Sequence, residues 1–136
     1  MEEHKIEPRC YIIMNKGLEM PVGKLAVQIG HSMDMVHECY YTIRDELIDG
    51  DENITKINMH KQYTEWKEAG RKKVLLRAKN DEELQELMSK LLAVGYVAFN
   101  VFDNGVNFFD GVTRTGIVVF PVLNSIKELK RVQVYK

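Results

Sequence analysis

The chain has 136 residues, of which 45% are hydrophobic and 29% are charged. This balance is ordinary for a globular domain and excludes an intrinsically disordered chain. We expect a single domain over residues 1–136. The 19 Lys and Arg residues nearly balance the 20 Asp and Glu residues, for a formal net charge of -1. That charge excludes a strongly basic nucleic-acid-binding tail, but it leaves room for a local basic patch.

The cysteines and the N-terminal segment indicate where the protein works. Cys10 lies in an apolar run and Cys39 on an apolar helix face, a placement typical of reduced, buried thiols in a cytosolic protein. The first residues lack the apolar core of a signal peptide. No apolar run approaches the roughly 20 residues that span a bilayer. We therefore expect a cytoplasmic protein with no membrane partner.

Strand and helix patterns alternate along the first half of the chain. The continuous apolar run 10–14 predicts a strand that is buried on both faces. Apolar residues then recur at helical spacing over 22–43 and predict a long helix. Segment 45–61 is polar and broken by Gly50, which predicts a loop. Residues 62–69 predict a short helix.

The second half continues the alternation. Residues 73–78 predict a strand, and Asn80 with Glu83 forms a capping-box pattern at the start of a helix. Gly95 is a natural helix terminator. The remaining expected elements are strands at 96–102 and 115–120, a short helix through Lys130 and an edge strand at 131–135.

The order β-α-α-β-α-β-β predicts an α/β fold, in which helices flank one sheet. Strands that are separated by helices favour a mostly parallel sheet. The strands at 96–102 and 115–120 have no helix between them, so we expect that pair to be antiparallel.

One candidate site lies at the start of the long helix. Lys24, Gln28 and His31 have the spacing i, i+4 and i+7, so they project along one side of the helix, opposite its apolar stripe. The junction of a strand with the following helix is where α/β proteins usually bind ligands. A lysine near a helix N-terminus opposes the helix dipole, which hints at an anionic ligand for Lys24. The alternative is an ordinary solvated helix face.

A second candidate is Asp103, which ends a strand in the turn Asp103-Asn104-Gly105. A carboxylate in this place can orient or deprotonate a water molecule. Thr115 begins the next strand and can place a hydroxyl beside it. The alternative is a plain turn, in which we expect the carboxylate to be solvated.

Basic residues form a third candidate. Arg71 and Lys72 belong to a short run of cations that can contact phosphates, although a solvated charge run is the commoner reason for such a pattern. The sequence contains no phosphate-binding or dinucleotide-binding glycine motif. Its four histidines lack the spacing of a zinc site, so we expect neither a metal nor a cofactor.

The candidates coincide with the motifs of a known family. Residues 18–32 (LEMPVGKLAVQIGHS) closely resemble the opening motif of type 2 peptidyl-tRNA hydrolases, and residues 66–74 (WKEAGRKKV) resemble a second motif. Asp103-Asn104-Gly105 resembles the D-A-G motif of the family, and Thr115 followed by Pro121 resembles its last strand. The resemblance covers about residues 10–121, with the motifs in the family's order.

The resemblance implies a mixed four-stranded sheet flanked by helices, usually as a homodimer. It also implies hydrolysis of the ester between a peptide and the terminal ribose of tRNA, without a metal or cofactor and with RNA rather than DNA as the partner. Lys24, Asp103 and Thr115 match residues of the family's proposed site. Asn107 stands where the family has its first site threonine; it can form hydrogen bonds but offers no hydroxyl. Two glycines also depart from the family pattern, Gly17 in place of an aspartate and Gly111 displaced by one residue.

We therefore expect a metal-independent esterase acting on peptidyl-tRNA. We assign Asp103, with Asn107 or Thr115, to positioning the water, and Lys24 to binding the oxyanion or the terminal phosphate. The expected substrate-binding residues are Gln28, His31, Arg71, Lys72 and Arg114. The alternatives are a hydrolase of a different ester, and a non-catalytic RNA- or protein-binding module with the same fold.

Overall fold

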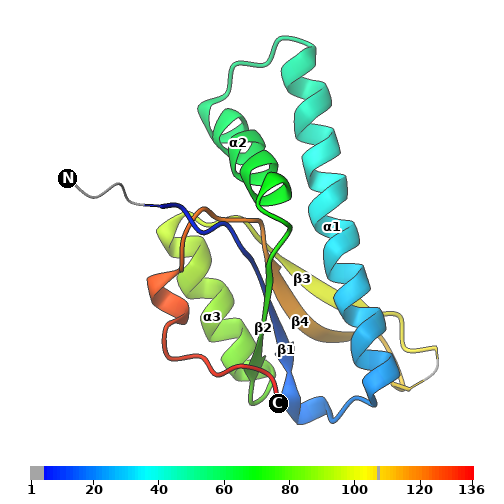
Figure 1. Cartoon of the computed structure of the whole chain (residues 1–136). Coiled ribbons are helices and arrows are strands. Elements are labelled where there is room, and N and C mark those ends of the chain that lie inside the picture. The colour runs from blue at the N-terminus through cyan, green and yellow to red at the C-terminus, as the bar shows by residue number, and fades with distance from the viewer. Residues whose placement is uncertain (1–4, 107) are drawn as a thin grey trace.

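The computed structural model describes residues 5–106 and 108–136. Its strands are β1 (Cys10–Asn15), β2 (Lys73–Ala78), β3 (Ala98–Asp103) and β4 (Thr113–Val119). Its helices are α1 (Val22–Ile48), α2 (Ile54–Glu68) and α3 (Asp81–Val94), with short 3-10 turns η1 (Lys16–Leu18) and η2 (Lys127–Leu129). The α/β fold and the order β-α-α-β-α-β-β are confirmed (Figure 1). In the described ranges, no helix has the length and apolar character that a bilayer span requires.

The four strands form one mixed sheet in the order β2-β1-β4-β3. Strands β1 and β2 are parallel, whereas β4 is antiparallel to both of its neighbours, β1 and β3. The expected antiparallel pairing of the last two strands is therefore confirmed, but the mostly parallel sheet is wrong. The cause is the position of β4. It inserts between β1 and β3 and thereby creates two antiparallel pairs.

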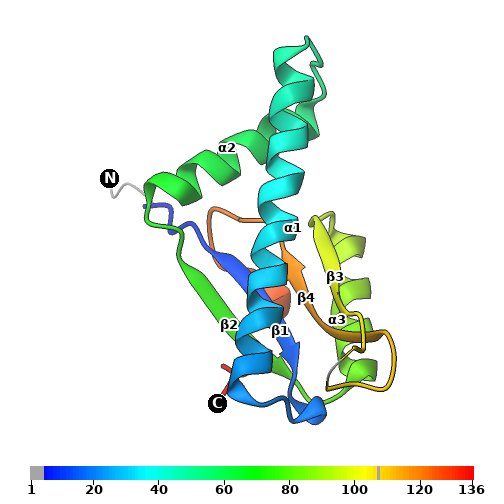
Figure 2. The ribbon, with the colours of Figure 1, turned by 90° about the vertical axis from the view of Figure 1, so that its right-hand side faces the viewer.

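Helices cover both faces of the sheet, and β1 is buried on each, as expected. Cys10, Ile12 and Met14 point into a core that they share with α1 and α2. The alternate residues Tyr11 and Ile13 point into a second core under α3. Figure 2 shows α1 crossing one face of the sheet while α3 lies behind the other. The three layers place the N-terminus of α1 beside the end of β3.

The expected loop at 45–61 is confirmed only for residues 49–53, and the rest of the segment is helical. Helix α1 continues to Ile48, and α2 begins at Ile54, where the side chain of Asn53 accepts a hydrogen bond from the Lys56 amide. Packing between the helices explains the difference, because Tyr40 of α1 stacks on Tyr63 of α2 with ring centroids 3.7 Å apart. Contacts so distant in sequence outweigh the weak helix propensity of a polar segment.

The helix signals of α3 are confirmed. Asn80 accepts a hydrogen bond from the Glu83 amide at 2.9 Å, and Gly95 ends the helix with a left-handed φ of 105°. Glu83 itself accepts from the amide of Lys79, the residue before the cap.

The expected edge strand at 131–135 is wrong, because that segment forms only an isolated bridge between Leu76 and Val134. Two backbone hydrogen bonds still join the segment to β2. The Arg77 amide donates to Gln133, and the Tyr135 amide donates to Leu75. The C-terminal segment therefore covers the open edge of the sheet, which protects that edge from pairing with other chains.

Two glycine substitutions test the packing of the sheet. A Cβ atom at Gly116 of β4 would lie 2.5 Å from the Ile13 carbonyl oxygen, whereas one at Gly30 of α1 meets nothing within 4 Å. We expect Gly116→Ala to lower the free energy of unfolding by about 1–3 kcal/mol, as overpacking does. We expect Gly30→Ala to raise it by about 0.4–1 kcal/mol, because alanine favours the helix. Urea denaturation measures both, and equal effects of the two variants would contradict the packing.

Candidate functional site

An ion pair joins the first turns of α1 to the end of β3. The Lys24 ammonium lies 2.5 Å from Asp103 Oδ1, and the two side chains are 16% and 7% exposed. The expectation that Asp103 is solvated in its turn is therefore wrong. Asp103 is the last residue of β3, and its side chain points to the same face as the buried Val101. That face is covered by α1, which supplies the partner charge.

A chain of hydrogen bonds extends from this pair into the core. Thr115 donates its hydroxyl to Gln28 Oε1 at 2.9 Å, and Gln28 donates its amide to Asp103 Oδ1 at 3.0 Å. The Thr115 hydroxyl also lies 3.2 Å from the Val101 carbonyl oxygen. Gln28 and Thr115 are fully buried, so the solvated helix face is wrong for Gln28. The two partners fix the orientation of the Gln28 amide, with its nitrogen toward Asp103.

A β-bulge places Thr115 in this chain. In the β3–β4 ladder, Val101 pairs with Gly116 and Phe102 pairs with Arg114, so Thr115 is the extra residue of the bulge. Bulges redirect side chains and are frequent beside active sites. Thr115 lies inside β4, two residues after the strand begins, and not at its start as the sequence suggested.

The environment of Asp103 favours its ionised form. The hydrogen bond from Lys24 is the largest of the effects that hold the pKa of Asp103 below its ordinary value. The Gly105 amide, which donates to Oδ2 at 2.7 Å, and the Gln28 amide lower the pKa further, while burial opposes them. Gly105 has a φ of 77°, and a Cβ atom there would clash with the backbone of Gly111. Only glycine therefore fits this turn without strain.

The ion pair opens into a cleft with a volume of about 580 Å³. Its polar lining includes Lys24, Asp103 and His31, and its apolar lining includes Val27, Phe102 and Val106. Those three apolar side chains are 50%, 53% and 81% exposed. Gln28 and Thr115 stand behind the cleft and do not line it. An ammonium group beside a carboxylate at the wall of such a cleft can hold an oxyanion and orient a water molecule.

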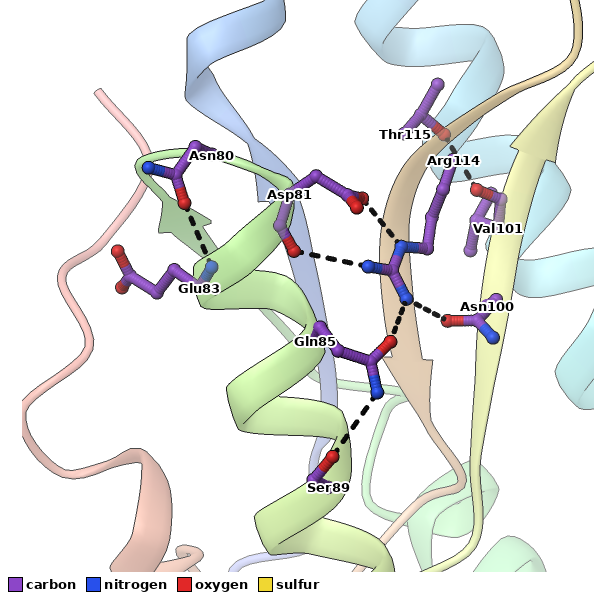
Figure 3. Close-up of polar contacts among 9 residues, drawn as sticks. All are labelled: Asn80, Asp81, Glu83, Gln85, Ser89, Asn100, Val101, Arg114 and Thr115. Carbon is purple, nitrogen blue, oxygen red and sulfur yellow. Dashed lines mark hydrogen bonds and ion pairs between the residues drawn. The ribbon is translucent and has the colours of Figure 1, made fainter.

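Arg114 does not face the cleft. It follows the alternation of β4 onto the opposite face of the sheet, where its guanidinium contacts Asp81 at 2.7 Å and Gln85 at 2.9 Å (Figure 3). It also donates to Asn100 of β3 at 3.2 Å. Figure 3 shows Arg114 directed at α3 while the Thr115 hydroxyl meets the Val101 carbonyl. Arg114 therefore holds α3 against the strands that carry the site.

Arg71 and Lys72 lie at the other end of the sheet. They precede β2, whose first residue pairs with Cys10 at the start of β1. The cleft lies at the opposite end of the strands, where β1 ends beside the start of β4. These two cations therefore do not form one patch with Lys24, and their substrate-binding role stays a prediction. Asn107 lies outside the residues that the structure describes.

The sequence did not predict the apolar rim of the cleft or the hydrogen bond from the Gly105 amide to Asp103. The signal for the rim was present in the exposed apolar residues that flank the end of β3. For metals, no group of three His, Cys, Asp or Glu side chains within residues 5–106 and 108–136 is placed to bind an ion.

The fold and the motifs together identify the family. A mixed four-stranded sheet flanked by helices, with Lys24 and Asp103 in contact, agrees with what the resemblance implies. The family model of peptidyl-tRNA hydrolase PTH2 matches residues 9–131. The chain belongs to the peptidyl-tRNA hydrolase PTH2 family. A search of curated proteins finds no match to the chain.

Removing the Lys24 charge tests the electrostatics of the site. We expect Lys24→Met to raise the pKa of Asp103, because it deletes the largest effect that lowers this pKa. A carboxyl-carbon NMR titration of wild type and variant measures the shift. Lys61→Met, which removes an exposed cation of α2, is the matched control and leaves the titration unchanged. An identical Asp103 titration in Lys24→Met and wild type would show that the ion pair does not form.

Proposed function

We propose that the protein hydrolyses the ester between a peptide and the terminal ribose of tRNA. The observation that supports this most is the Lys24–Asp103 pair at the wall of an open cleft. Membership of the PTH2 family supports the choice of substrate. As the resemblance implies, we also propose a homodimer that works without a metal or cofactor, and from the cysteines and the N-terminal segment we propose a cytoplasmic location.

Lys24 is the proposed group that stabilises the oxyanion. Hydrolysis of an ester places negative charge on the carbonyl oxygen, and a donor held in place beforehand stabilises that charge without reorganisation. The ion pair with Asp103 and the contact with Phe109, whose ring centroid is 5.9 Å from Nζ, hold the ammonium in place.

Asp103 is the proposed group that orients the water. Its lowered pKa makes it a weak base, so its main contribution is to accept a hydrogen bond from the attacking water. The water oxygen forms a bond to the ester carbon, and the carbonyl electrons become the oxyanion. The bond between that carbon and the ribose oxygen then breaks, and the ribose oxygen takes the proton that the water releases through Asp103. The products are a peptide with a free carboxyl group and a tRNA with a free hydroxyl.

Gln28 and Thr115 are proposed as positioning residues because neither lines the cleft. Thr115 orients the Gln28 amide, and Gln28 holds one oxygen of Asp103. This leaves Oδ2, which accepts from the Gly105 amide, as the oxygen that can also meet the water. His31 lines the cleft and is proposed to contact the substrate. For Asn107 we keep the role expected from the sequence, a hydrogen bond to the water.

The proposed chemistry is tested by release of tRNA from an N-acetyl-aminoacyl-tRNA. We expect Lys24→Met and Asp103→Asn each to lower kcat at least about 100-fold, the low end for losing an oxyanion donor or a general base. Asp103→Asn also lowers the melting temperature, because it leaves a largely buried ammonium without its counter-ion. Circular dichroism at the assay temperature confirms that each variant is folded.

Three outcomes would contradict the proposal. Wild-type protein that binds tRNA without releasing the peptide is a non-catalytic RNA-binding module. Wild-type protein that cleaves only small esters is a hydrolase of a different ester. If Lys24→Met and Asp103→Asn keep full activity, other residues carry out the chemistry.

The positioning role of Thr115 has its own test. We expect Thr115→Val to lower kcat about fivefold with little change in KM, because losing one hydrogen bond costs about 1 kcal/mol. Thr115→Ser keeps the hydroxyl and retains most of kcat. Full kcat in the valine variant together with a decrease in the serine variant would show that Thr115 acts by packing and not through its hydroxyl.

A further inference from the structure

A second cavity lies at the same end of the sheet as the cleft, where β1, β2 and β3 finish. It has a volume of about 470 Å³ and forms where β1 and β2 end against the C-terminal segment. Its lining contains the four cations Lys16, Arg77, Lys79 and Arg131 and the single carboxylate of Glu83. We call these four cations and the cavity between them the basic groove.

The backbone builds the basic groove from segments that are distant in the sequence. At Gly17 a Cβ atom would clash with the Lys79 carbonyl oxygen, so only glycine lets η1 pack against the end of β2. This close approach puts Lys16 beside Lys79. The C-terminal segment closes the other side. Arg77 donates to the Gln133 side chain, and the Lys16 ammonium lies 4.6 Å from the ring centroid of Tyr135.

The positive charges of the basic groove are only partly compensated by neighbouring groups of the chain. Among the described residues, no carboxylate side chain forms an ion pair with any of the four cations. The one acidic neighbour, Glu83, is engaged as an acceptor for the Lys79 backbone amide. Lys16 already donates to the oxygen of Lys136. The four cations still outnumber the one carboxylate in the lining, and an anionic ligand relieves their mutual repulsion.

The chemistry of the groove fits a chain of phosphates. Arginine forks and lysine ammonium groups are the side chains that most often contact nucleic-acid phosphates, and four cations around one cavity match several neighbouring phosphate charges. The chain as a whole has a net charge of -1, so any attraction for RNA has to be local. A single small carboxylate would satisfy only part of this array.

The groove and the cleft are placed to serve one ligand. Sheet order puts β2 three strands from β3, which at about 4.8 Å per strand separates their ends by roughly 14 Å. η1 leads from Lys16 directly toward α1, which carries Lys24. Figure 1 shows the C-terminus, the end of β1 and the start of α1 gathered at one end of the molecule.

We propose that the basic groove binds phosphates of the tRNA acceptor strand while the ester lies in the cleft. This inference rests on the proposed function, because it places the RNA relative to the proposed site of ester cleavage. It assigns the binding of the RNA backbone to Lys16, Arg77, Lys79 and Arg131, and not to Arg71 and Lys72 at the far end of the sheet.

The test removes two groove cations whose side chains form no hydrogen bond or ion pair within the described chain. Lys79→Ala/Arg131→Ala is compared with Lys61→Ala/Lys67→Ala, which removes two exposed cations of α2 and so matches the change in net charge. Two substrates carry the same ester, N-acetyl-aminoacyl-tRNA and N-acetyl-aminoacyl-adenosine, and the second has no phosphate. Binding of uncharged tRNA is measured separately, by fluorescence anisotropy over a range of salt concentrations.

We expect the groove variant to raise KM for the tRNA substrate about tenfold or more, with kcat unchanged. The log–log salt slope of tRNA binding becomes shallower by about 0.7–0.9 for each phosphate that the variant no longer binds. Hydrolysis of the adenosine ester is unchanged, and the α2 variant behaves as wild type with both substrates.

Several results would overturn the proposal. One is a groove variant whose KM and salt slope equal those of a wild-type protein that cleaves the tRNA ester. In that case the proposed function stands, and the groove does not bind the RNA. If the α2 variant weakens tRNA binding equally, the effect comes from net charge and not from the groove. A different result separates the two proposals. If the wild-type protein cleaves no ester, and the groove variant binds tRNA less tightly than wild type, the groove is an RNA-binding site and the proposed function is refuted.

Discussion

The ion pair between Lys24 and Asp103 is the interaction on which the rest of this site depends. Removing two charges from water is costly, and the mutual attraction offsets that cost only when the remaining hydrogen-bonding capacity is also satisfied. Gln28 and Gly105 provide that satisfaction, one at each oxygen of the carboxylate. Both requirements constrain the backbone. Gln28 has to be buried on α1, and Gly105 has to adopt a left-handed turn.

This constraint divides α1 into two halves with different tasks. In the second half, Val36, Tyr40 and Ile43 pack into the core with α2, as an amphipathic helix does. In the first half, the buried positions are Gln28, whose amide contacts Asp103 and Thr115, and Ser32, whose hydroxyl donates to the Gln28 carbonyl within α1. A polar buried face stabilises a fold less than an apolar one, so the site is maintained at some expense of stability. The aromatic contacts of the far half of α1 compensate by fixing the helix against α2.

Local signals in the sequence were sufficient for part of the fold. The apolar run of β1, the bounds of β2 and the caps of α3 follow from side-chain pattern and backbone chemistry within a few residues, and the structure confirms them. The start of α2 was missed because it depends on the stack of Tyr63 on Tyr40, which brings two helices together. The edge strand was wrong for a related reason, since the C-terminal segment follows β2 without completing a ladder.

The candidate site was reached by motif and not by periodicity. Helical spacing alone put Gln28 on a solvated face, because an amide in an amphipathic pattern reads as exposed unless its partners are known. Those partners, Asp103 and Thr115, are 75 and 87 residues away. The bulge that orients Thr115 has no local sequence signature. Arg114 was expected to bind substrate because its partner Asp81 lies on another element and could not be foreseen. Only the family motifs carried this long-range information.

The same ion pair gives a reason for the proposed RNA recognition to use a second place on the surface. Lys24 is neutralised by Asp103, so the cleft offers little net positive charge to a polyanion. A stronger positive field there would stabilise the bound substrate as much as the transition state. Such uniform stabilisation does not raise kcat. Separate placement resolves the conflict. In the proposed mode of binding, the groove cations, none of which is ion-paired with a carboxylate side chain in the described residues, attract phosphates. The cleft then stays balanced for the charge that develops during the proposed hydrolysis.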